Sequence, residues 1–414
     1  MADNRRRSPR RRYRAPRQRR YVSPKTKWII TLAALGVIAL ALLVLAFLNG
    51  WITLPKLPEK PVETTPSTEP SKDTVIHFVA GGDVNITDKV VAAGGPDYDY
   101  TNIFLDVLPV LAAGDLTALN FEGNAAGSPY GTETVSAPTQ LLSALRYAGA
   151  DVLQTANSHS ITNGLRGLRS TNDAIRNAGM QPLGTYANQT EFQKYQGYLV
   201  YEIQGIRIAL VAFTKGMDGR NLPEGMEHCV NLLYTDYSSN YKEVNEDGIT
   251  AVIKAAEVVQ PDITIAMVHW GSEYNDQISA TQKEICQLMA DLGVDALIGT
   301  HSHHVQPIGF DSKSGMFVAY SLGDFLGDAA VAGTEYSVLL NLEITRSGAD
   351  GKVRITGYDY TPIYQHYDEN GNLQLLRIRE AIAAYENDYI GKVSDSVYSS
   401  IKAALQRIEA RVKE

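Results

Sequence analysis

Cysteine is nearly absent from this sequence, which contains only Cys229 and Cys286 among its 414 residues. Two thiols cannot build the disulfide framework that stabilises many small secreted domains. They could form one bridge in an oxidising compartment, but we interpret them as two isolated thiols. From Asp73 onward the sequence also lacks internal repeats and low-complexity tracts, which excludes a repeat array for the body of the chain.

Acidic residues are almost missing from positions 1–27, where Asp3 stands against 12 lysines and arginines. The whole chain has 38 basic and 46 acidic residues, so the remainder carries 26 basic and 45 acidic residues, a net charge of −19. A basic N-terminal segment followed by an acidic remainder indicates that the chain consists of two distinct parts. A nucleic-acid-binding arm is one interpretation of the arginine run, but topogenic or anionic-lipid contact is favoured. We predict no nucleic-acid partner.

Charge is absent from positions 28–48, a run of 21 residues rich in Leu, Ala, Ile and Val. A helix of that length spans the hydrocarbon core of a bilayer, and Trp28 and Trp51 stand where interfacial aromatic residues belong. The cationic flank stays in the cytoplasm. A cleaved signal peptide is the alternative, but no Ala-x-Ala-like site follows. We therefore predict a single-pass cell-membrane protein with a cytoplasmic N-terminus and an extracellular C-terminal domain.

Composition changes along the chain divide it into five predicted segments. The Pro/Thr/Glu-rich stretch after the apolar run is typical of an extended spacer. The C-terminal stretch 373–414 favours one or two amphipathic helices that pack on the domain, although a partner-binding helix is an alternative. The segments are a basic cytoplasmic tail (1–27), a transmembrane helix (28–48), a linker (49–72), a globular domain (73–366) and a C-terminal helical extension (367–414).

Apolar runs alternate with amphipathic stretches from Asp73 onward, which indicates an α/β fold with a largely parallel core finished by hairpins. Gln204-Gly205 separates two strand-like runs and predicts a hairpin turn. Strands are predicted at 75–80, 116–121, 152–155, 198–203, 206–213, 263–268, 296–298, 317–320, 337–344 and 353–360. Helices are predicted at 139–148, 165–179, 248–259 and 280–292, with Gly149, Gly179 and Gly293 at their ends.

Five of the predicted strands end in a polar cluster. In open α/β sheets, ligands bind at the carboxyl ends of the strands. Imidazole and carboxylate groups without thiolate suit Mn, Fe or Zn better than Ca or Mg, so the clusters predict a divalent metal site. The clusters are Gly81-Gly82-Asp83, Asn120-Phe121-Glu122, Asn157-Ser158-His159, His269-Trp270-Gly271 and Gly299-Thr300-His301-Ser302-His303-His304.

Ordinary structural roles are the alternatives for these residues. Asp83 could cap a turn, Glu122 could lie on a rim, His159 could cap the following helix, and His269 could be a buried histidine bonded to the backbone. His301 and His303 are the strongest pair, because residues two apart in an extended backbone share one face.

Four further residues are predicted to contact substrate: Asn120, Trp270, Glu273 and Lys215. Trp270 and Glu273 follow a strand that ends in a candidate ligand. Lys215 also follows a strand end, where it could bind phosphate or carboxylate as a point charge. The alternatives are a core tryptophan, a solvated glutamate and a surface lysine.

Taken together, these segments resemble the CapA family of poly-γ-glutamate capsule synthesis proteins, a branch of the calcineurin-like metallophosphatase superfamily. The resemblance covers about residues 75–362. The supporting motifs are Gly82-Asp83-Val84, Asn120-Phe121-Glu122, Ala156-Asn157-Ser158-His159, Val268-His269-Trp270-Gly271-Ser272-Glu273-Tyr274, Gly299-Thr300-His301-Ser302-His303 and Tyr320-Ser321-Leu322-Gly323-Asp324-Phe325.

The resemblance implies a metallophosphatase-like four-layer αββα sandwich preceded by one transmembrane helix. It implies that His159 contacts the reacting phosphate or acts as an acid, and that His303 completes the shell. The implied metal ligands are Asp83, Glu122, Asn157, His269 and His301.

The sequence also departs from the superfamily pattern. Asn85 stands where the first motif has a histidine, and Ser158 stands where an asparagine normally precedes the third-motif histidine. Thr162-Asn163 replace an Asp and an aromatic residue, and Asp324 replaces an Asn. A two-metal centre, a single metal and a metal-free cleft therefore all stay open.

Three functions follow from these observations. The first is assembly of an anionic surface polymer outside the membrane, with capsule synthesis and export proteins as partners. The second is metal-dependent hydrolysis of a phosphoester in the cell envelope. The third is a binding scaffold that has lost catalysis.

Overall fold

The computed structural model describes residues 72–413 of the chain. The predicted basic tail, the predicted transmembrane helix and nearly all of the predicted linker lie outside the described residues. Among residues 72–413, no helix combines the length and the apolar character that crossing a membrane requires.

The first sheet contains eight strands within the described part of the chain, in the order β14-β13-β12-β1-β2-β3-β4, with β11 paired to β1 beyond that path. Strands β1 to β4 pair in parallel, whereas β12, β13 and β14 continue the sheet antiparallel from β1. Their bounds are β1 Thr74–Asn85, β2 Leu116–Glu122, β3 Val152–Gln154, β4 Gln181–Leu183, β11 Asp324–Leu326, β12 Tyr336–Arg346, β13 Val353–Tyr367 and β14 Leu373–Arg377.

The second sheet has six strands in the described residues, in the order β5-β6-β7-β8-β10-β9. The inner pairings β6-β7-β8-β10 are parallel, and the outer pairs β5-β6 and β9-β10 are antiparallel. Every residue of β7 and β8 is buried, as expected for parallel strands covered on both faces. The bounds are β5 Tyr198–Ile203, β6 Ile206–Thr214, β7 Ile263–His269, β8 Ala296–Thr300, β9 Ile308–Phe310 and β10 Phe317–Ala319.

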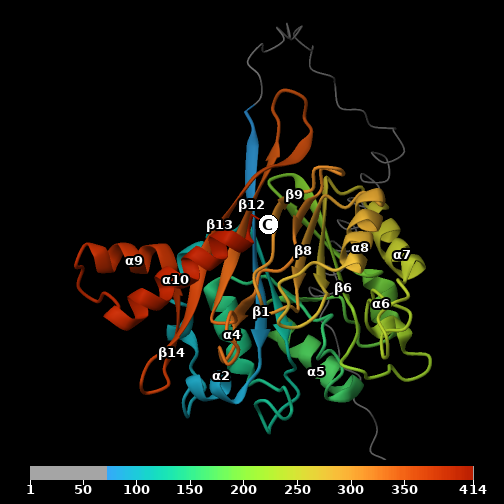
Figure 1. The fold of residues 1–414 in the computed structure, drawn as a ribbon. Helices are drawn as coiled ribbons and strands as arrows, with labels where there is room; N and C mark the ends of the chain where they lie inside the picture. The colour runs from blue at the N-terminus through green and yellow to red at the C-terminus, as the bar shows by residue number, and fades with distance from the viewer. Residues whose placement is uncertain (1–71, 414) are drawn as a thin grey trace, which may run out of the picture. The chain divides into compact units, whose positions relative to one another are not determined.

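The hydrophobic core lies in three clusters that alternate with the sheets. The largest cluster joins alternate residues of both sheets, such as Phe78 of β1 and Ile265 of β7, so the sheets pack face to face. A second joins the other face of the first sheet to helix α4, and a third joins the other face of the second sheet to helices α7 and α8. Figure 1 shows α7 and α8 together on one side of β6 and β8.

Five of the α-helices among residues 72–413 begin after a residue whose side chain accepts a hydrogen bond from the first turn. Helix α8 begins with a capping box made by Ser279 and Gln282, which satisfies two otherwise unpaired amides. The α-helices are α2 Asp88–Ala93, α3 Leu108–Leu111, α4 Thr139–Ala148, α5 Gly164–Asn177, α6 Gln189–Tyr195, α7 Glu246–Glu257, α8 Ala280–Asp291, α9 Ile378–Glu386 and α10 Asp395–Arg411, and 3-10 turns span Thr101–Phe104 and Glu227–Cys229.

The predicted α/β class is confirmed, and the strands form two mixed sheets. Helix α4 has the predicted bounds, and Gln204-Gly205 does join β5 and β6 as an antiparallel hairpin. Cys229 and Cys286 are both free and buried, which confirms two isolated thiols.

Four short strands were not predicted: β4, β9, β11 and β14. The last of these corrects the expectation of helix throughout 373–414. Leu373 and Leu375 are buried and Gln374 is exposed, a period of two that pairs this segment with β13 as an edge strand. The helices α9 and α10 follow it, and Ile401, Ala404 and Ile408 of α10 are buried in the largest cluster.

Candidate metal centre

The polar strand ends meet where the two sheets face each other. Asp83 lies near the end of β1, and Glu122 and His269 are the last residues of β2 and β7. His301 follows β8 directly. Since β1 and β2 are parallel, as are β7 and β8, their carboxyl ends lie at common edges. This topology brings together side chains that are up to 218 residues apart.

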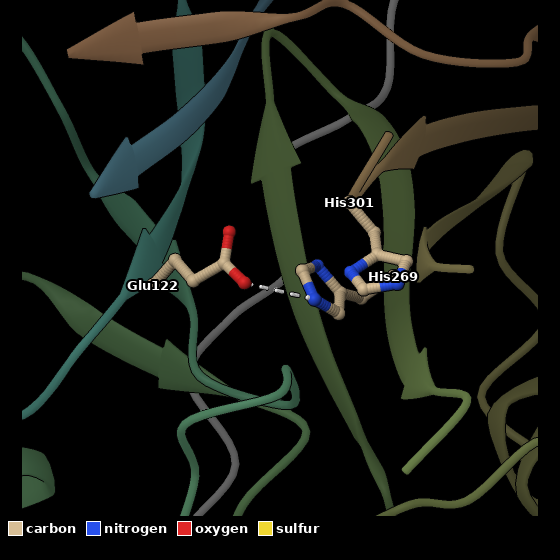
Figure 2. Close-up of side chains that lie close together, drawn as sticks. All are labelled: Glu122, His269 and His301. Carbon is tan, nitrogen blue, oxygen red and sulfur yellow. Dashed lines mark ion pairs between the residues drawn. The ribbon is translucent and has the colours of Figure 1, made fainter. Parts of the chain in front are cut away.

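Glu122, His269 and His301 form the first group with metal-ligand geometry. One potential ligand atom from each lies within 4.8 Å of those of the other two. Glu122 Oε1 is 3.2 Å from His269 Nε2, and the two imidazole centroids are 4.5 Å apart. Figure 2 shows the carboxylate of Glu122 directed at the His269 ring, with His301 beside it.

Asp83, Glu122 and His303 form a second group with the same spacing. His303 Nδ1 is 3.7 Å from Asp83 Oδ2. Glu122 belongs to both groups, and its Oε2 is buried without a hydrogen-bond partner among the described residues. Because an unpaired buried carboxylate oxygen is costly, this atom is where a bound cation would be most stabilising.

Two buried asparagines, Asn120 and Asn157, form a hydrogen-bond network next to the candidate ligands. Asn120 donates from Nδ2 to Asp83 Oδ1 at 2.6 Å. Asn157 donates to Asn120 Oδ1 at 3.1 Å and to the carbonyl of Phe121 at 2.7 Å, and its own Oδ1 accepts from the amide of His159. Asn157 therefore supports Asn120, and its predicted role as a metal ligand stays a prediction. Asn120 itself contacts the candidate ligand Asp83, whereas contact with substrate was predicted.

Burial sets the charge of the first group. Desolvation raises the pKa of Glu122 and lowers the pKa of His269 to about 3. Desolvation followed by repulsion from His269 also lowers the pKa of His301. Both imidazoles are therefore neutral near pH 7, which is the form that binds a metal.

Burial favours the protonated form of Asp83 and its hydrogen bonds favour the ionised form, a conflict that a bound cation would remove. Burial, assisted by Glu122, raises its pKa to about 7. Yet both of its oxygens accept N–H bonds, one from Asn120 and one from the amide of His301 at 3.0 Å. An ionised carboxylate suits those bonds best, and a positive charge in the centre would favour that ionised form.

Asp324 is a site residue that sequence reasoning missed. Its Oδ1 lies 2.8 Å from His303 Nδ1, and β11 places it opposite Asp83. Although burial opposes it, the Asp324 carboxylate raises the pKa of His303 well above its usual value. The charge of Asp324 therefore favours the protonated form of His303, and His303 Nδ1 could bind metal only without that proton. The available signal was the Gly323-Asp324 motif, where Asp324 counted only as a departure.

Ser158 is a second missed residue. Its Oγ is 3.0 Å from His269 Nε2 and 3.5 Å from His301 Nδ1. The serine that replaces the usual asparagine therefore reaches two ligands of the first group. Its position beside His159 in the third motif was the only sequence signal.

Two clefts flank the ligand groups. The first, which we call the His303 cleft, is lined by His159, Glu122, Glu273, Tyr274, His303 and Asp324, among others. The second, the Lys215 cleft, is lined by Ser158, Lys215, Tyr241, Ser272, Glu273 and His301, among others. Glu273 borders both clefts, so the two are neighbours across the centre.

The other predicted site residues divide between cleft and core. His159 is half-buried in the His303 cleft, where its Nδ1 is 3.1 Å from Thr162 Oγ1. Lys215 Nζ donates to the carbonyl of Gly271 at 2.7 Å and lies 3.3 Å from His301 Nε2. Trp270 is fully buried, and its indole bonds the carbonyl of Tyr320, so it lies in the core and lines neither cleft.

The residues present therefore fit a divalent transition metal. The donor set contains neutral imidazole and buried carboxylate, which suits Mn, Fe or Zn, and one oxygen of Glu122 has no hydrogen-bond partner within residues 72–413. Glu122, His269 and His301 would hold one ion, and Asp83, Glu122 and His303 are arranged for a second.

With metal chelated, the stability advantage of the parent protein over an Asp83→Asn variant should fall as pH rises. The folded-state pKa of Asp83 is raised from 3.8 to about 7. A carboxyl whose folded pKa exceeds its unfolded pKa contributes stability below the unfolded value and loses it as pH rises through the folded one. Urea unfolding of both proteins in EDTA across that window measures the difference. Parallel pH profiles would show that folding does not raise the pKa of Asp83.

The comparisons of this sequence with known proteins agree on one family. The sequence model of "Bacterial capsule synthesis protein PGA_cap" matches residues 77–329. "PGA biosynthesis protein CapA" of Bacillus subtilis (strain 168) is 24% identical over 310 residues, which cover 71% of this chain and 74% of that protein. "Capsule biosynthesis protein CapA" of Bacillus anthracis is 26% identical over 275 residues, which cover 63% and 61%.

Solved structures are more distant. The calcineurin-like phosphoesterase YfkN from Bacillus subtilis is 14% identical with a TM-score of 0.43, over 83% of this chain and all of that one. A novel phosphatase from Mycoplasma pneumoniae is 14% identical with a TM-score of 0.42, over 72% and 96%.

Proposed function

We propose that this chain, which belongs to the PGA_cap family of bacterial capsule synthesis proteins, acts in the synthesis or export of an anionic surface polymer of the poly-γ-glutamate type. The family match carries this proposal. It spans the region that contains Asp83, Glu122, His269, His301, His303 and Asp324. The printed names of both Bacillus relatives also refer to capsule or PGA biosynthesis.

The two clefts support a chain-like substrate. They lie on either side of the ligand groups and share Glu273, so a linear polymer could run from one to the other across the centre. The described chain is acidic overall, and attraction for a polyanion must therefore be local. Lys215 offers one positive charge there, and a metal held by Glu122, His269 and His301 would add more.

In the chemistry that we propose, a bound metal would polarise a substrate oxygen and lower the pKa of a water molecule. The chain's own residues supply the rest. His159 lies in the His303 cleft, where its imidazole can exchange a proton with a leaving group, and burial lowers its pKa despite the opposing charge of Glu122. Lys215 faces the other cleft, where its ammonium can orient an anionic group.

Location is part of the same proposal. The uncharged run 28–48 and the basic residues before it support a membrane anchor with the described domain outside the cell. Such an anchor would hold the clefts near polymers made at the membrane or exported through it. Capsule synthesis and export proteins are the partners that this placement favours.

Deleting the gene in a polymer-making host should abolish or strongly reduce surface polymer, because the family match supports a role for the protein in that pathway. Polymer extracted from the cell surface and quantified by size fractionation measures the effect. The parent gene should restore the polymer, whereas His301→Ala should not, since it removes a ligand of the first group. Unchanged polymer after deletion would defeat the proposal.

The same complementation separates the alternative functions. If His301→Ala restores polymer as well as the parent gene, the protein is a binding scaffold of this family and not a metal-dependent hydrolase. The metal-ligand geometry and the cleft position of His159 also favour a second candidate, a phosphoesterase acting on a cell-envelope substrate. Release of phosphate from envelope fractions by the purified protein, lost in His301→Ala, would identify that activity.

A further inference from the structure

The exposed loop of residues 271–279, which we call the Tyr274 loop, forms one wall of the metal centre. It begins after β7 and ends at the capping box of α8. The Tyr274 ring stacks on His303 at 5.1 Å between centroids, and the Tyr274 amide donates to the carbonyl of Ser302 at 2.8 Å. The loop therefore covers a candidate ligand with a side chain that is itself half-exposed.

A second set of contacts ties this loop to the segment that follows β8. Gln306 donates from Nε2 to the carbonyl of Asn275 at 2.7 Å. Asp276 Oδ1 is 2.7 Å from His304 Nδ1, and His304 is the immediate neighbour of His303. Thus the position of Asp276 is coupled to the backbone that presents the ligand histidines.

The other carboxylate oxygen of Asp276 accepts a hydrogen bond from the C-terminal helix α10. Arg411, the last residue of α10, donates from Nη2 to Asp276 Oδ2 at 2.7 Å. The Arg411 side chain is only 19% exposed, and its Nη1 is buried without a hydrogen-bond partner among the described residues. Arg411 also lies 5.9 Å from the centre of the Tyr336 ring, and 40% of the Asp276 side chain is exposed. Because the guanidinium is mostly buried, its bond to Asp276 should still be stronger than a fully exposed ion pair.

The ligand segment needs this external support. His301 and His303 have φ angles of 88° and 59°, in the left-handed region that non-glycine residues seldom adopt. Such conformations cost about 1–3 kcal/mol each and persist only where surrounding contacts hold them. Stacking by Tyr274 and the bond between Asp276 and His304 are among the contacts that do so.

We propose that Arg411 is a positioning residue, which acts through Asp276 to keep the Tyr274 loop closed over the metal centre and His303 in place. The C-terminal helix would then control how tightly the centre holds its ion, although no residue of that helix lies in either cleft that flanks the ligand groups. This inference rests on the proposed metal centre for its effect on binding, but its effect on the loop does not require a metal.

The test compares three variants of the full-length protein. Arg411→Gln should speed amide exchange at Tyr274 and its loop neighbours in metal-free protein, because the amide that reports closure is bonded to Ser302. It should also weaken Mn²⁺ binding, measured by titration calorimetry, by up to about tenfold, the lower range for residues that support ligands. Arg411→Lys, which keeps the charge, should recover part of both effects.

Arg407→Gln is the matched control. Arg407 lies one turn earlier on α10, and its guanidinium is 3.7 Å from Glu335 with 58% of its side chain exposed, so its loss should change neither readout. Unchanged exchange in Arg411→Gln, or equal changes in both glutamine variants, would overturn the inference. If the parent protein binds none of Mn²⁺, Fe²⁺ and Zn²⁺, the proposed metal centre fails, and exchange in the metal-free variants still decides the role of Arg411.

Discussion

Replacing Glu122 by Gln should abolish specific Mn²⁺ binding, with a loss of affinity of at least about a hundredfold. Glu122 is the one residue common to both ligand groups, so a single substitution removes an anionic oxygen from each. Asp83, His269, His301 and His303 would remain, but neither group would keep its shared ligand. Calorimetric titration and elemental analysis of the purified protein measure the loss.

Folding should survive this substitution, which makes the result interpretable. Burial raises the pKa of Glu122, so without a metal the buried carboxylate is unfavourable and a neutral amide of the same size is tolerated. In EDTA the variant should be at least as stable as the parent, whereas with Mn²⁺ only the parent gains stability, as expected when a ligand binds the folded state alone.

Glu273→Gln is the matched control for this experiment. Glu273 borders both clefts but belongs to neither ligand group, so its substitution should leave Mn²⁺ affinity within about twofold, a change of under about 0.5 kcal/mol. Equal losses in the two variants would mean that overall negative charge in the clefts holds the ion. Retained affinity in Glu122→Gln would refute the shared-ligand arrangement.

The position of the centre could be predicted from sequence because parallel strands constrain it. Asp83, Glu122, His269 and His301 all stand at the carboxyl ends of apolar runs, and parallel pairing brings such ends together. The amphipathic pattern also predicted α4, and Gln204-Gly205 between two apolar runs predicted the β5-β6 hairpin, both at their observed positions. These features depend on local pattern, which a sequence displays directly.

Residues whose role depends on side-chain direction could not be placed in this way. Trp270 and Glu273 lie three positions apart, yet one is in the core and the other borders both clefts. Asn157 was predicted to bind metal, and in the structure its amide forms hydrogen bonds with Asn120, Phe121 and His159, so its role as a ligand stays a prediction. Strand-end location alone does not distinguish a ligand from the residue that holds it.

Long-range pairing explains the remaining gaps. Asp324 becomes a site residue only because β11, a strand of three residues, pairs in parallel with β1. Such a short segment has too few residues to show a period of its own. The role of Arg411 also depends on a contact between distant parts of the sequence. Arg411 reaches the centre through Asp276 from a helix that ends 135 residues further along the chain.

Gly82→Ala should lower the free energy of unfolding by about 3 kcal/mol or more, beyond the usual range for an added methyl group. The strand β1 changes register between Ala80 and Asp83, where it also begins to pair with β11. A Cβ at position 82 would lie 1.7 Å from the carbonyl oxygen of Gly323, and backbone atoms cannot rotate away as a flexible side chain can. The strand β11 must therefore separate from β1.

The separation of β11 from β1 should weaken metal binding as well as lower the stability of the fold. The amide of Asp83 donates to the same carbonyl of Gly323 at 3.1 Å, and Gly323 immediately precedes Asp324, the partner of His303. Urea unfolding and Mn²⁺ titration should therefore both show a loss. Gly309→Ala is the control, because a Cβ there meets only the Tyr358 hydroxyl at 3.6 Å and the change should be nearly neutral. Equal effects of the two alanines would show that close approach of β1 and β11 is not what position 82 requires.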